Sequence, residues 1–218
     1  AFTLGKDLHT YTASLVFNKS EEKVTKQERQ IAKAVSFLIV YGGGAFNLSE
    51  TMSIPLKRAE KIIAQYAKVY PGIFKYMNRV NASIEEDGYI TTLFGRRRNL
   101  PDVRSTVFKI KNRAFRQGLN FTVQSAASDI LVCAVLGIVE EIKNRDLKAF
   151  FQATVHDSVE FVCPKEETEE VCSIIQDEML NCHYMKSKLG IALDVPMAID
   201  LEVGSSFGDG VEYEVAST

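Results

Sequence analysis

Several features that would suggest a function at once are missing from this sequence of 218 residues. Its four cysteines form no CxxC pair and have no metal-ligand spacing with the three histidines, which argues against zinc and favours reduced thiols. The longest apolar candidate, 130–139, is too short for a membrane helix and is bounded by Asp129 and Glu140. The N-terminus also lacks the basic and apolar blocks of a signal peptide. We therefore expect a cytoplasmic protein with no membrane partner.

An excess of one charge is also lacking, because the net charge is only −2. The charge is nevertheless unevenly distributed. Residues 96–116 contain eight lysines and arginines and a single carboxylate, Asp102, whereas EETEE at 166–170 is strongly acidic. A near-neutral average can therefore conceal a basic face that would recognise a polyanion.

The hydrophobic pattern indicates an α+β fold in which helices outnumber the strands of a small antiparallel sheet. There is no repeat and no low-complexity tract, and the length fits one domain or one domain with a subdomain. The pattern predicts helices at 8–17, 27–41, 55–70, 72–88, 112–143 (with a break at Gly118) and 166–185. It predicts strands at 89–95, at 150–164 as a hairpin turning at 156–158, and at 195–204.

One predicted helix has an ordered row of side chains. Arg29, Lys33, Phe37 and Tyr41 follow one another at intervals of four, directly before three glycines. At about 100° per residue this spacing drifts by only about 40° per step, so the four side chains share one face. The cations could contact phosphates while the rings stack on a base or sugar. Taken singly, each residue fits an ordinary amphipathic helix, but the register of all four favours the nucleotide.

The second candidate site is the VHDSV segment, where Asp157 lies at the expected tip of the hairpin. Aspartate and serine are common turn residues, so the segment is explained equally well by turn chemistry. It is explained just as well by a carboxylate that a rigid hairpin presents to a divalent cation. The local pattern does not decide between the two.

Together, these segments resemble family A DNA polymerases, the group that includes bacterial DNA polymerase I and many phage replicases. The resemblance is carried by RxxxKxxxFxxxYG and by the strand–HD–strand hairpin. Four further segments match in family order: GKDLHTYTASLVF, DGYITTLFGRRRNLPD, RxxxNxxxQSAASDI and VPMAIDLEVGSSFG. The resemblance therefore covers almost the whole chain.

This resemblance implies a role for each matching residue. Those implied to bind the incoming deoxynucleoside triphosphate (dNTP) are His9, Arg29, Lys33, Phe37 and Tyr41. Lys33 would also donate a proton to the pyrophosphate. Those implied to contact the DNA primer–template are Arg116, Asn120, Gln124 and His156. Asp157 would be a catalytic ligand for Mg²⁺.

Two positions depart from the family pattern. Leu38 stands where a glycine is usual, so the helix face near the nucleotide would pack more tightly. Ser158 stands where many members have glutamate, which removes a carboxylate next to Asp157.

The family's first metal-binding aspartate lies in a motif resembling DYSQIELR, upstream of the GKDLHT-like segment. We therefore expect 1–218 to be a C-terminal polymerase fragment, with fingers at about 20–90 and the distal palm at 1–19 and 91–218. The thumb, the first palm strand and any exonuclease domain would be absent.

The expected fold is thus a helical fingers subdomain packed on part of a polymerase palm. The expected activity is DNA-directed DNA synthesis in the cytoplasm (a host cytoplasm for a viral protein). This chain alone would be inactive and would need a separate polypeptide that carries the N-terminal half. The alternatives are a non-catalytic DNA- or nucleotide-binding module on the same scaffold and a structural helical protein with a fortuitous basic patch.

Overall fold

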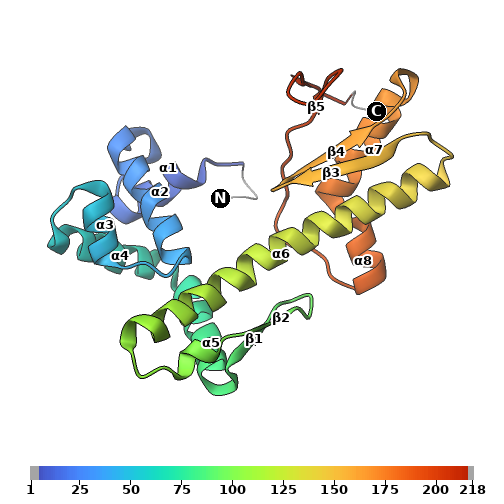
Figure 1. Cartoon of the computed structure of the whole chain (residues 1–218). Coiled ribbons are helices and arrows are strands. Elements are labelled where there is room, and N and C mark those ends of the chain that lie inside the picture. The colour runs from blue at the N-terminus through green and yellow to red at the C-terminus, as the bar shows by residue number, and fades with distance from the viewer. Residues whose placement is uncertain (1–4, 216–218) are drawn as a thin grey trace. The chain divides into compact units, whose positions relative to one another are not determined.

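The computed structural model describes residues 5–215 and has an α+β fold in which helices predominate (Figure 1). The helices are α1 Leu8–Phe17, α2 Lys26–Val40, α3 Ala45–Met52, α4 Leu56–Val69, α5 Pro71–Asp87, α6 Phe108–Asn144, α7 Thr168–Asn181 and α8 His183–Leu189. The strands are β1 Tyr89–Thr91, β2 Arg97–Asn99, β3 Phe150–Val155, β4 Ser158–Val162, β5 Glu202–Val203 and β6 Val211–Glu212. Each strand pairs antiparallel with its neighbour in sequence, so the described strands form three separate pairs rather than one sheet. The chain divides into two compact units, one ending at Ala126 and the other starting at Ala127.

The first unit is built around the buried face of α2. Ile31, Val35 and Ile39 are at most 3% exposed and belong to one hydrophobic cluster with residues of α1, α3 and α4. The helix begins at a capping box, in which the Glu28 N–H donates to Thr25 Oγ1 and the Thr25 N–H donates to the Glu28 carboxylate. The buried stripe therefore leaves the opposite face of α2 free for other functions.

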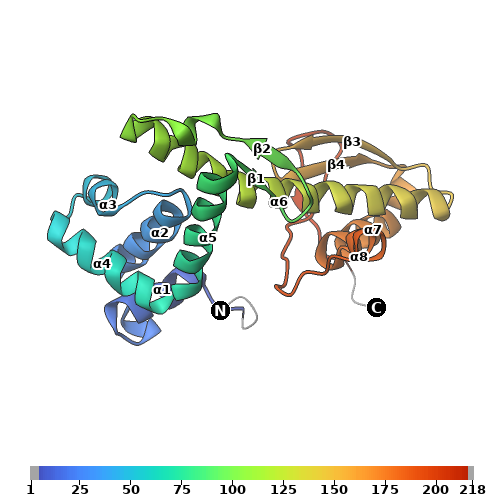
Figure 2. The same ribbon diagram turned by 90° about the horizontal axis from the view of Figure 1, so that it is seen from below.

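A second cluster in this unit joins α5, the β1–β2 pair and the first half of α6 (Figure 2). Gly118, expected to break α6, does not break it, because the helix runs on for 37 residues. A Cβ at this position would lie 2.3 Å from Ile84 Cδ1 and 2.8 Å from Leu100 Cδ1. The glycine therefore permits close packing of α6 on α5 and does not end the helix.

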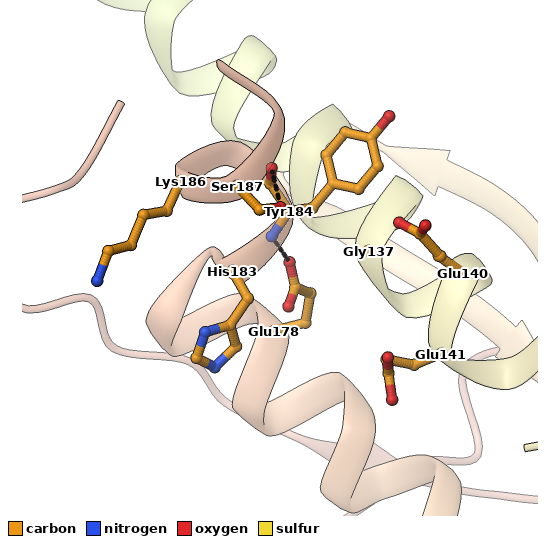
Figure 3. A pocket seen from close by; sticks show the side chains of 8 residues that line it. All are labelled: Gly137, Glu140, Glu141, Glu178, His183, Tyr184, Lys186 and Ser187. Atoms are coloured by element: carbon orange, nitrogen blue, oxygen red, sulfur yellow. Dashed lines mark hydrogen bonds between the residues drawn. The ribbon is translucent and has the colours of Figure 1, made fainter. Parts of the chain in front are cut away.

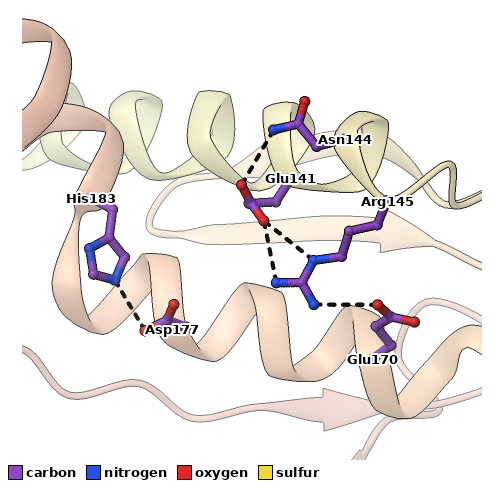
Figure 4. A network of polar contacts seen from close by, with 6 residues as sticks. All are labelled: Glu141, Asn144, Arg145, Glu170, Asp177 and His183. Carbon is purple, nitrogen blue, oxygen red and sulfur yellow. Dashed lines mark hydrogen bonds and ion pairs between the residues drawn. The ribbon is translucent and has the colours of Figure 1, made fainter.

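In the second unit, the last turns of α6 pack with α7 and the β3–β4 hairpin. Ile138 and Ile142 of α6 share a hydrophobic cluster with Val171 and Ile174 of α7, and Phe161 of β4 packs against it. At the surface, Arg145, which directly follows α6, donates to Glu141 of α6 and to Glu170 of α7 (Figure 4). Such exposed ion pairs add little stability, so the apolar cluster holds these elements together.

The single helix expected at 166–185 is interrupted at Cys182, which has a left-handed backbone (φ 48°). Beyond it, the Tyr184 N–H at the start of α8 donates to Oε1 of buried Glu178 at 2.7 Å (Figure 3). Gly137 makes room for this carboxylate, because a Cβ there would come within 2.6 Å of Glu178 Cγ. A cavity of about 500 Å³ opens beside these residues. The break is thus stabilised by a local side-chain-to-backbone hydrogen bond, for which Gly137 of α6 leaves the space.

Two further expectations about secondary structure were wrong. The strand expected at 195–204 is limited to Glu202–Val203, and the short helix α3 was not expected. The expectation that no segment is apolar and long enough to cross a membrane also fails by those two criteria alone, because α6 meets them. Core helices meet the same criteria, and Ala134, Ile138 and Ile142 of α6 are buried in the protein.

Candidate functional site

The face of α2 opposite the core carries the predicted row of side chains. Lys33 is exposed, and Phe37 and Tyr41 are 50% and 46% exposed, large fractions for aromatic rings. Tyr41 follows the last residue of α2, but its N–H still donates to the Phe37 carbonyl at 3.0 Å, so it continues the helical register. The structure therefore presents cations and then aromatic rings along one accessible face, as the sequence predicts.

Arg29 at the N-terminal end of this row is held by a carboxylate of α1. Its Nε and Nη2 donate to Asp7 Oδ1 and Oδ2 at 3.0 and 2.8 Å, a bidentate pair. Asp7 Oδ1 also accepts from the Thr10 N–H at 2.7 Å and caps α1. The Arg29 guanidinium and these hydrogen bonds hold the pKa of the Asp7 carboxyl well below its usual value, and Asp7 raises the pKa of Arg29.

His9, in the first turn of α1, is brought to the same face of α2. Its ring centroid lies 6.0 Å from that of Phe37, and its Nδ1 is buried without a hydrogen-bond partner. Burial lowers the pKa of His9. The nearby positive charges of Arg29 and Lys33 lower this pKa further, whereas the negative charge of Asp7 raises it. The neutral imidazole therefore predominates at pH 7, beside two permanent cations.

The C-terminal end of the row adjoins α6. At Gly42, where φ is +71°, a Cβ would lie only 2.7 Å from Cγ of Arg116. The aliphatic stem of Arg116 is therefore packed against the backbone directly after Tyr41. The structure thus brings one predicted DNA-binding residue beside a predicted nucleotide-binding residue.

Gly43 lies against Leu38, which is one of the two departures from the family pattern. The Gly43 N–H donates to the Leu38 carbonyl at 2.8 Å, and a Cβ at Gly43 would lie within 2.6 Å of both Leu38 Cγ and Cδ1. Leu38 packs against the hydrophobic cluster of α2, as its bulk suggests. Its side chain therefore occupies space that only a glycine at position 43 leaves open.

Asn120 and Gln124 follow Arg116 at intervals of four on α6, and all three lie within the first unit. Gln124 is exposed, whereas Oδ1 of Asn120 is buried without a hydrogen-bond partner. In the described part of the chain, buried side-chain atoms of this kind belong to His9, Asn81 and Asn120. Because buried polar groups are normally paired, their presence in two predicted site residues is consistent with a functional surface.

An apolar hollow of about 310 Å³ lies beside the end of α2. It is lined by Val40, Gly72, Ile73, Tyr76, Met77, Leu119 and Val123. These mostly apolar walls suit a flat or aliphatic group better than a phosphate.

His156 and Asp157 form the two-residue turn of the β3–β4 hairpin, in which Val155 pairs with Ser158. Both are exposed, and His156 has a positive φ of 57°, which the first position of a two-residue hairpin turn requires. Across residues 5–215, no group of three or more His, Cys, Asp or Glu side chains is arranged to hold a metal ion. Asp157 offers the oxygen ligands that Mg²⁺ prefers, but these described residues do not complete a site around it.

The sequence reasoning missed Asp7. Its position before LHTYTASLVF is a recognisable N-cap signal, but its pairing with Arg29, 22 residues away, depends on how α1 packs against α2. It likewise missed the contact between Gly42 and Arg116, since the glycines were interpreted only as a helix stop.

Comparison with known proteins bears on the fold and the family of the chain. A solved structure with similar architecture is the POL domain of Pol1 from M. smegmatis in complex with DNA primer-template and dNTP. It matches with a TM-score of 0.79 and 30% identity over 91% of this chain and 34% of that one. The family model for DNA polymerase family A matches residues 1–209, and the chain belongs to that family.

Among relatives, the chain is 35% identical to DNA polymerase I of Bacillus caldotenax and 36% identical to that of Bacillus subtilis (strain 168). Each match covers 209 residues, which is 96% of this chain and 23% of the relative. The chain therefore spans less than a quarter of the length of these DNA polymerases.

Proposed function

We propose that this chain supplies the dNTP-binding helix, part of the primer–template surface and one metal-binding carboxylate of a template-directed DNA polymerase. In this proposal, about 20–90 form the fingers, and 1–19 and 91–218 form the distal palm. The single observation that carries the proposal is the accessible face of α2, where cations precede aromatic rings beside His9. Two further findings support it. The chain belongs to DNA polymerase family A, and the related Pol1 structure is a complex with DNA primer-template and dNTP.

At the nucleotide, Arg29, Lys33 and His9 contact the triphosphate, and Phe37 and Tyr41 contact the sugar and base. The order along α2 matches the order of groups along a nucleoside triphosphate. The exposed Lys33 ammonium stabilises the negative charge that develops on the leaving pyrophosphate and donates a proton to it. Its position four residues beyond Arg29 allows both cations to contact one triphosphate.

At the primer–template, Arg116, Asn120 and Gln124 contact the minor groove from one face of α6. Acceptors in that groove have similar positions in every correct base pair, so these contacts suit a protein that must tolerate any sequence. The packing of Arg116 against Gly42 supports the proposal, because it places this surface beside Tyr41.

At the metal, Asp157 would ligate Mg²⁺ and His156 would contact the primer end. Bound Mg²⁺ would activate the attacking hydroxyl and neutralise phosphate charge. A two-metal site needs further carboxylates, and the described residues around Asp157 do not supply them. We propose that an upstream segment provides them, either in a longer chain or as a separate polypeptide, and that these 218 residues alone are inactive. We place this activity in the cytoplasm.

Primer extension with Mg²⁺ and dNTPs tests the catalytic part of the proposal. The chain should be inactive alone and active when mixed with a polypeptide that carries the upstream half of a family A polymerase. Asp157→Asn should abolish the activity of the mixture. Asp146→Asn is the matched control, because this exposed residue has φ +56°, which asparagine accepts. Extension that survives Asp157→Asn would refute the metal assignment.

Separate measurements of dNTP and duplex affinity test the placement of α2. Lys33→Ala should weaken dNTP binding about tenfold or more and leave duplex affinity nearly unchanged. The control Lys61→Ala removes an exposed lysine of α4 and should change neither affinity. An equal loss of both affinities in Lys33→Ala would contradict the assignment.

The alternative is a non-catalytic DNA- or nucleotide-binding module on the same scaffold. The observation that favours it is the lack of a complete metal-binding cluster within 5–215. It predicts dNTP and duplex binding but no extension with any upstream polypeptide, so the same two experiments decide between the alternatives.

A further inference from the structure

Within residues 5–215, the carboxylate of Asp7 accepts from only part of the N–H donors of the Arg29 guanidinium. A guanidinium has five N–H donors, of which Asp7 accepts Nε–H and one from Nη2. The second Nη2 donor and one Nη1 donor form the adjacent, end-on edge of the guanidinium, and within residues 5–215 neither has a hydrogen-bond partner. The two side chains are 39% and 46% exposed, so the pair lies at the surface, where a phosphate can approach it.

Asp7 is itself fixed. The Thr10 N–H donates to the same Oδ1 that accepts from Arg29, which ties the carboxylate to the first turn of α1. That turn also carries His9, whose ring lies beside Phe37. One carboxylate therefore connects the start of α1, with its predicted phosphate contact, to the cationic end of α2.

We propose that Asp7 is a positioning residue for triphosphate binding, which fixes the Arg29 guanidinium so that its open edge faces the phosphates. The proposal rests on the function proposed above for the α2 face. An arginine whose rotamers are already restricted loses less conformational entropy when it binds a planar, bidentate partner. Asp7 thus acts through Arg29 and need not touch the nucleotide.

Competition between Asp7 and a phosphate for Arg29 would have the opposite effect on triphosphate affinity. If Asp7 competed with phosphate for Arg29, its removal would free a cation, remove a negative charge and tighten binding. The side-on geometry favours positioning, because the edge that Asp7 occupies is not the only edge able to bind a phosphate.

Isothermal titration of the 218-residue chain with dATP and with inorganic tripolyphosphate tests the proposal. Asp7→Ser is the informative variant, since serine still caps α1 but cannot reach Arg29 with a bidentate carboxylate. Glu21→Gln is the matched control, because it removes another exposed ion pair of the same region, with Lys6. Both variants should melt within a few degrees of the wild type.

We expect Asp7→Ser to raise the dissociation constants of both ligands about fivefold. In an Arg29→Ala background the same substitution should change them by less than about twofold. Wild-type or tighter binding by Asp7→Ser would overturn the positioning role. A fivefold loss that persists without Arg29 would overturn it too, since Asp7 would then act through the fold. If the wild type binds neither ligand, the proposed function fails and this inference falls with it.

Discussion

Substitution of Gly118 by alanine should destabilise the first unit, although alanine is the better helix former. The added Cβ would lie 2.3 Å from Ile84 Cδ1 and 2.8 Å from Leu100 Cδ1, where ordinary contacts begin at 3.4 Å. Ile84 and Leu100 are at most 3% exposed, so neither side chain can move aside without repacking the core around it. Overpacking of this kind costs about 2 kcal/mol. The gain in helix propensity is about 1 kcal/mol, so the net loss is about 1 kcal/mol.

Urea denaturation followed by circular dichroism measures this loss. The control Gly72→Ala places the same methyl group in α5, where no atom lies within 4 Å, and should leave stability unchanged or raise it. Ile84→Val removes the atom that clashes most and alone costs about 1 kcal/mol. The double variant Gly118→Ala/Ile84→Val should therefore be less destabilised than the sum of the two single variants. A Gly118→Ala protein as stable as the wild type, or strict additivity, would refute the packing argument.

Three further substitutions have defined outcomes. The pKa of Glu28 is lowered from 4.5 to about 2 by Lys19 and the capping box. Glu28→Ala should therefore cost about 1 kcal/mol above pH 4.5, and the difference should vanish as the pH falls towards 2 in urea titrations. Burial lowers the pKa of His9 below 6.5, so its neutral form stabilises the fold fully above pH 6.5, and this stability is lost at lower pH. Protonation adds a cation, so dATP affinity should rise as the pH falls, and calorimetry should find no such rise in His9→Gln. Gly137→Ala displaces Glu178 from the Tyr184 N–H and should cost about 2 kcal/mol; a thermal melt identical to the wild type would contradict this.

Most helices of the first unit could be predicted because their signals are local, although α3 was missed. Thr25 and Glu28 form a capping box in sequence as well as in space, and Gly42 allows the chain to leave α2. The shared face of the row on α2 could be predicted from the four-residue spacing of its side chains alone. The hairpin at 150–164 was equally local, since β-branched and aromatic residues flank a polar turn.

The errors arose where tertiary contacts decide the structure. Gly118 has the sequence signature of a break, but its lack of a side chain serves the packing against Ile84. Cys182 carries no turn signal, and the Glu178 carboxylate that accepts from the Tyr184 N–H beyond it needs the space that Gly137 of α6 leaves open. The partner of Arg29 could not be inferred, because Asp7 lies on another helix. Within the candidate site, residue types and spacing were therefore accessible, whereas the contacts that orient them were not.

The fit between Leu38 and Gly43 has a practical consequence for protein engineers. Grafting this leucine into a family A DNA polymerase should require glycine five positions later in the recipient, because a methyl group there would collide with the isobutyl chain. Positions 38 and 43 should therefore be substituted together, and mutant libraries that vary one position should vary the other with it.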